Sequence, residues 1–63
     1  MNYHIKAQIR NMIEMTEAFK TACKLAAIEN DGQIDKAEAK ALKQINAAAE
    51  RFIKDLSKIK VDD

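Results

Sequence analysis

The sequence predicts an all-α protein, folded as an antiparallel two-helix hairpin in one domain over residues 1–63. The chain has no Pro and a single Gly, so it lacks the turn residues that sheets, sandwiches and barrels require. Ala, Lys, Glu and Leu dominate the composition, as is typical of helices. Apolar residues recur every three or four positions in two segments separated by one interruption, which indicates two amphipathic helices.

The first helix is predicted over about residues 3–29. Its apolar positions alternate between spacings of four and three residues, a pattern typical of a helix that packs along one stripe against another helix. The residues of this predicted stripe are Ile5, Ile9, Met12, Thr16, Phe19, Cys23 and Ala26.

The interruption is the segment Asn30-Asp31-Gly32-Gln33. Gly32 can adopt a positive φ at low cost and is therefore expected to end the first helix. Asp35 and Glu38 stand three residues apart, so each can bond to the backbone N–H of the other in a capping box. The next helix is accordingly predicted to begin at residue 35.

The second helix is predicted over about residues 35–60. Its stripe has the same spacing and consists of Leu42, Ile45, Ala49, Phe52, Leu56 and Ile59. Because the helices have similar lengths and a short connection, we expect antiparallel neighbours. Folding at the interruption then places Met12 near Phe52 and Phe19 near Ile45.

The apolar surface of both helices is wider than one helix–helix contact needs. A second copy could cover the remainder, which predicts a homodimeric four-helix bundle. A helix of another protein could occupy the same surface, since Met-rich patches adapt to varied partners. The predicted interface, for the copy or for a partner, is Met12, Met15, Ala18, Phe19, Ala22, Leu25, Ala48 and Ile53.

A row of basic residues follows the second helix on the side opposite its apolar stripe. The chain has 11 basic and 10 acidic residues, so its net charge is not that of a dedicated nucleic-acid-binding protein. The row could still contact phosphates, although a solvated lysine face is the commoner arrangement. It consists of Lys36, Lys40, Lys43, Arg51, Lys54 and Lys58. A dimeric helical hairpin of this size is similar in architecture to the Rop family, and that similarity implies binding to paired RNA loops.

Residues 27–38 resemble a single, degenerate EF-hand loop, with Gly32 at the position of that family's turn glycine. The resemblance implies a calcium ion bound by Glu29, Asp31, Asp35 and Glu38, since calcium prefers oxygen ligands at alternate loop positions. The capping box accounts for Asp35 and Glu38 without an ion, so both interpretations stay open at this stage.

Catalysis has few candidates, because the chain has one His and one Cys. His4 and Cys23 lie about 28 Å apart along one helix at about 1.5 Å per residue. We therefore expect no catalytic residues and no enzyme. A lone Cys fits the reducing cytoplasm, and neither a secretory signal nor a membrane-spanning segment is predicted. The expected function is that of a small binding protein, acting as an adaptor, inhibitor or regulator through helix–helix contacts.

Overall fold

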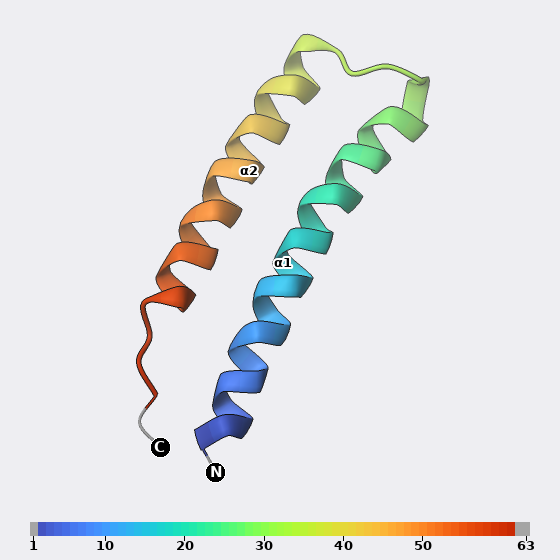
Figure 1. Cartoon of the computed structure of the whole chain (residues 1–63). Coiled ribbons are helices and arrows are strands. Elements are labelled where there is room, and N and C mark those ends of the chain that lie inside the picture. The colour runs from blue at the N-terminus through green and yellow to red at the C-terminus, as the bar shows by residue number, and fades with distance from the viewer. Residues whose placement is uncertain (1, 62–63) are drawn as a thin grey trace.

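The computed structural model describes residues 2–61, with only the backbone described for residues 30 and 31. It confirms the predicted fold class, since two helices pack side by side as an antiparallel hairpin (Figure 1). Helix α1 spans Asn2–Asp31 and helix α2 spans Lys36–Ser57. Both chain ends lie at the same end of the hairpin, opposite the connection between the helices (Figure 1).

The connection forms as the sequence predicts. Gly32 has a φ of 79°, and its N–H donates to the carbonyl oxygen of Ile28 at 2.7 Å. This bond satisfies one of the carbonyls that the end of a helix would otherwise leave without a partner. Glycine adopts this backbone conformation without the steric cost that a Cβ atom brings.

The start of α2 is the predicted capping box. The Glu38 N–H donates to Oδ1 of Asp35 at 2.8 Å, and the Asp35 N–H donates to Oε1 of Glu38 at 3.1 Å. Asp35 itself is in extended conformation, with φ −81° and ψ 177°. It is therefore the N-cap, and the helix proper begins one residue later, at Lys36.

The end of α2 differs from the prediction, because the helix stops at Ser57 and not near residue 60. The Ser57 hydroxyl donates to the carbonyl oxygen of Ile53 at 2.8 Å. Beyond Lys58 the chain leaves the helix, and Val61 joins Ile9 at the rim of a shallow apolar groove. At 100° per residue a continued helix would turn Val61 toward solvent on the basic side, so leaving the helix lets this side chain cover apolar surface.

The contact between the helices is rotated relative to the predicted stripes. Ile9, Thr16 and Cys23 face α2 as predicted, and Leu42, Ile45, Ala49 and Leu56 face α1. The other positions differ, because the less exposed residues are Ile13, Lys20, Ala27 and Ile53, whereas several predicted stripe residues are exposed: Ile5, Met12, Phe19, Ala26, Phe52 and Ile59. The prediction that these residues are covered by the neighbouring helix was therefore wrong, although Met12 and Phe52, like Phe19 and Ile45, line one groove between the helices as the predicted pairing implies.

The rotation has a physical explanation. It places the β-branched side chains of Ile13 and Ile53 between the helices and allows a close approach where Ala49 and Thr16 are both buried. The Thr16 hydroxyl can be buried there because it donates to the carbonyl oxygen of Met12 at 2.7 Å. The cost is that the largest side chains of the predicted stripes are left on the surface of the hairpin.

Within the described residues, neither helix is long and apolar enough to cross a membrane. The core is also small. Among these residues the only apolar side chain classed as buried is that of Ala49, and no large side chain is fully buried.

Candidate interaction surface

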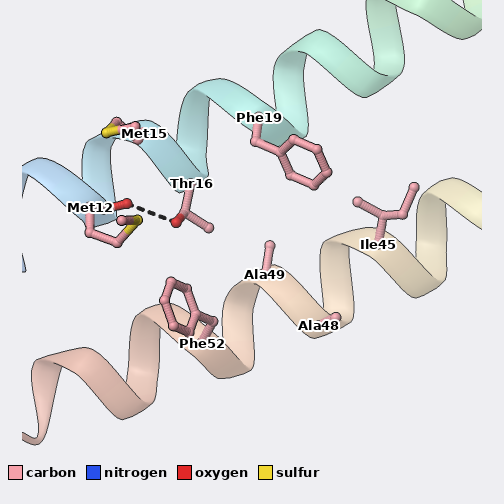
Figure 2. Close-up of a pocket in the computed structure, with 8 residues that line it drawn as sticks. All are labelled: Met12, Met15, Thr16, Phe19, Ile45, Ala48, Ala49 and Phe52. Atoms are coloured by element: carbon pink, nitrogen blue, oxygen red, sulfur yellow. Dashed lines mark hydrogen bonds between the residues drawn. The ribbon is translucent and has the colours of Figure 1, made fainter.

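One side of the hairpin carries an open apolar groove of about 460 Å³. Figure 2 shows that α1 and α2 contribute equally to it, with the side chains of Phe52 and Ala49 directed toward α1. We call this side, defined by the groove, the apolar face. The groove is lined by Met12, Met15, Thr16, Phe19, Ile45, Ala48, Ala49 and Phe52.

The large side chains of the apolar face are unusually exposed for their type. Met15 and Phe19 are 60% and 55% exposed, and Met12 and Phe52 are 41% and 44% exposed. Fully burying one such side chain contributes about 1.5–3 kcal/mol. A contiguous apolar patch of this kind is typical of an interaction site.

The predicted interface residues divide into three groups. Met12, Met15, Phe19 and Ala48 come together in the groove. Ala18, Ala22 and Leu25 are exposed on α1 but do not line it. Ile53 is half-buried in the contact with α1 and is not available to a partner in the way the sequence suggested.

Four groove residues were assigned from the sequence to the helix–helix contact and not to an interaction surface. Helical periodicity identified the apolar sector of each helix, but it did not show which part of that sector the neighbouring helix would cover. The width of the sector was the available signal. These residues are Thr16, Ile45, Ala49 and Phe52.

The opposite side of the hairpin mixes polar side chains with apolar ones, among them Ile34, Ala39 and Leu42. A second groove of about 520 Å³ lies there and includes Lys24, Lys43 and Asn46. Lys20 lies in the same groove, where its ammonium pairs with Glu50 across the helices and with Glu17 at 3.3 Å. The hydrogen bond to Glu50 raises the pKa of Lys20 above its ordinary value. We call this second groove the polar groove, because three lysines line it and no charged residue lines the first.

The six residues of the predicted basic row are all exposed. Their helical positions place five of them on the side of α2 that faces away from α1, while Lys43 borders the second groove. None of the six forms an ion pair with a residue in the described part of the chain. Tyr3, an exposed aromatic residue, has its ring centroid 4.2 Å from that of His4 at the first turn of α1.

The predicted calcium ligands are used differently in the structure. Asp35 and Glu38 bond to each other's backbone N–H groups in the capping box. Glu29 is exposed within α1, while the side chain of Asp31 lies outside the described residues. In the described part of the chain, no three His, Cys, Asp or Glu side chains gather in a way that could hold a metal ion. Since α1 continues through Asp31, the first third of the EF-hand-like segment is helix.

Cys23 carries a free thiol and is half-buried where α1 contacts α2. His4 lies in the first turn of the same helix, at the other end of the hairpin. Helical geometry separates them by about 28 Å, so the histidine cannot activate the thiol within one chain.

Comparisons with known proteins return no relative: no family model, no curated protein and no solved structure significantly matches this chain.

Proposed function

We propose that this chain is a small, non-enzymatic binding protein of the cytoplasm that acts as an adaptor, inhibitor or regulator through helix–helix contacts at the apolar face. The observation that carries the proposal is the groove between α1 and α2, in which Met15 and Phe19 are more than half exposed. An amphipathic helix laid in such a groove contacts it through residues spaced three and four apart.

The chemistry of the groove suits this role. Met12 and Met15 have flexible, polarisable side chains that adapt to varied apolar surfaces. The aromatic rings of Phe19 and Phe52 supply large contact areas, as aromatic side chains do at the centres of many interfaces. The opposite side, with its paired Lys20, can stay in water when the groove is filled.

Affinity capture from the native host tests the proposal. The full chain, the variant Met15→Glu and the control Thr21→Glu are immobilised in parallel. Both substitutions add one carboxylate at an exposed position of α1, but Thr21 lines the polar groove and Met15 the apolar one. We expect a partner that is retained by the chain and by Thr21→Glu and lost on Met15→Glu. A partner that binds Met15→Glu equally well would contradict this function.

A second candidate function is contact with RNA or DNA, favoured by the six exposed cations of the basic row, none of which is ion-paired with a residue that the structure describes. A dimer would carry two such rows, as the architectural similarity to Rop implies. Cations that neutralise phosphates release counterions, so binding must weaken steeply with salt.

The test of this second function uses two charge-matched double variants. We expect Lys40→Glu with Lys54→Glu to abolish retention on RNA at low salt, while Arg10→Glu with Lys24→Glu, which changes the net charge equally from exposed sites on α1, leaves it largely intact. If both double variants lose retention on RNA equally, net charge alone explains the binding and the basic row is not the site. If the unmodified chain is not retained at low salt, the nucleic-acid-binding function is rejected.

A further inference from the structure

From the surface of the hairpin we infer that the occupant of the apolar face is a second copy of this chain, docked with α1 of each copy against α2 of the other and with both connections at the same end of a four-helix bundle. The inference rests on the proposed function, because it names the helices that fill the same groove.

The exposed area indicates that one copy is incomplete. The hairpin exposes 5217 Å², whereas a compact folded monomer of 7.1 kDa exposes about 4,100 Å² by the usual scaling with mass. The excess is about 1,100 Å², compared with about 800 Å² that each partner covers in a stable protein interface. Docking one further hairpin on the apolar face is therefore enough to bring the exposed area to an ordinary value.

Two symmetric arrangements keep all neighbouring helices antiparallel. In the first, the two connections lie at the same end, and α1 packs on the partner's α2. In the second, the connections lie at opposite ends, and each helix packs on its own counterpart. Side-chain size and charge distinguish the two arrangements.

Side-chain size favours the first arrangement. In the groove, α1 contributes the bulky side chains of Met12, Met15 and Phe19, whereas α2 contributes Ala48 and Ala49 beside Ile45 and Phe52. The separation of packed helices depends on the side chains at the contact. Pairing α1 with α2 lets the bulky side chains of α1 pack against a helix whose middle carries two alanines, while pairing like with like would push the α1 helices apart and leave a gap between the alanines of the α2 helices.

Charge favours the same arrangement. Each helix has an outer flank, which borders the apolar face on the side away from the other helix of the hairpin. At 100° per residue the outer flank of α2 includes Lys40, Arg51 and Lys58 with one acidic residue, Asp55, so it is cationic on balance, and that of α1 includes Glu29 and no Lys or Arg. The first arrangement places the cationic flank beside the flank that carries Glu29. The second sets the cationic flanks of the two α2 helices against each other, where their like charges repel.

The assembly and the pairing are tested on the full chain. Light scattering at micromolar concentration is expected to give twice the 7.1 kDa chain mass. Ala48→Glu places a carboxylate in the groove and is expected to give the single-chain mass, whereas Asn46→Glu, in the polar groove of the same helix, is expected to keep the double mass. A wild-type mass of one chain, or of any number other than two, would overturn the inference.

The distance between the connections of the two copies distinguishes the two arrangements. In a chain with Cys23→Ser and Gln33→Cys, a nitroxide label sits on the exposed connection, and electron–electron resonance measures the separation between copies. The inferred arrangement predicts a separation within about 25 Å, because neighbouring helix axes lie about 8–10 Å apart. Labels at opposite ends would be separated by most of the 48 Å length of the hairpin, and that result would refute the pairing.

Failure of this inference is distinguishable from failure of the proposed function. A monomer that still captures a partner through Met15 would reject the second copy and keep the interaction surface. A dimer whose mass is unchanged by Ala48→Glu would reject the apolar face itself, and with it both conclusions.

Discussion

Removal of the Asp35 carboxylate tests how the hairpin is held at its turn. In Asp35→Ala the Glu38 N–H loses the carboxylate oxygen that accepts from it at 2.8 Å. The reciprocal hydrogen bond, from the backbone N–H of residue 35 to the Glu38 carboxylate, is then no longer supported by the first one. Loss of an N-cap side chain costs about 0.5–2 kcal/mol. Because the cap is exposed, water can replace the lost acceptor, and we expect about 1 kcal/mol. For a domain of this size that corresponds to a drop in Tm of about 4–8 °C.

The measurement is thermal unfolding followed by far-ultraviolet circular dichroism, at one fixed chain concentration because association would shift Tm by mass action. Asp35→Asn is the matched control, since its amide oxygen can still accept from the Glu38 N–H. We expect its Tm to stay close to that of the unmodified chain. If Asp35→Asn loses as much as Asp35→Ala, the stabilisation does not come from the cap hydrogen bond and the reasoning fails.

Three further predictions follow from the same geometry. Gly32→Ala should lower the free energy of unfolding by about 1–2 kcal/mol, because an L-residue is strained at a φ of +79° even though its Cβ would meet no atom within 4 Å. A chemically synthesised chain with D-alanine in place of Gly32 should recover the lost stability, since a D-residue favours positive φ. If it does not recover, the loss has a cause other than backbone strain. The hydrogen bond to Glu50 raises the pKa of Lys20, so the pair contributes its full stabilisation below about pH 10.5 and loses it as the pH rises through the higher pKa of the folded state. Urea unfolding should therefore show the free energy of unfolding falling more steeply with alkaline pH for the unmodified chain than for Lys20→Met. The same pH dependence in both chains would contradict a stabilising role of the pair. Calcium or EDTA should leave Tm unchanged because Asp35 and Glu38 serve the helix cap; a rise in Tm with calcium that Glu38→Gln removes would show that the loop binds the ion.

The local features of the fold were predictable because each depends on neighbouring residues alone. Gly32 ends one helix and the pair Asp35–Glu38 begins the next, as their positions in the sequence indicate. The end of α2 was not predictable in this way. The chain leaves the helix after Ser57, and Val61 then reaches the groove beside Ile9, which is a tertiary contact.

The candidate site was predicted in part. The sequence identified Met12, Met15 and Phe19 as an apolar patch, and the structure places all three in one groove. It did not show that Ile53 would lie between the helices and that Phe52 would line the open groove, 44% exposed. Both residues belong to the same apolar sector of α2, and the choice between them depends on how closely Ala49 and Thr16 allow the helices to approach.

The rate at which peroxide oxidises Met15 shows whether the apolar face is covered in solution. In the lone hairpin this thioether is 60% exposed, and oxidation of methionine follows access to the sulfur. If a second copy covers this face, mass spectrometry of the native full chain should show Met15 oxidised several-fold more slowly than in the urea-unfolded chain. Ala48→Glu should remove this protection. Equal rates in the native and unfolded chains would show an uncovered face and contradict docking by a second copy.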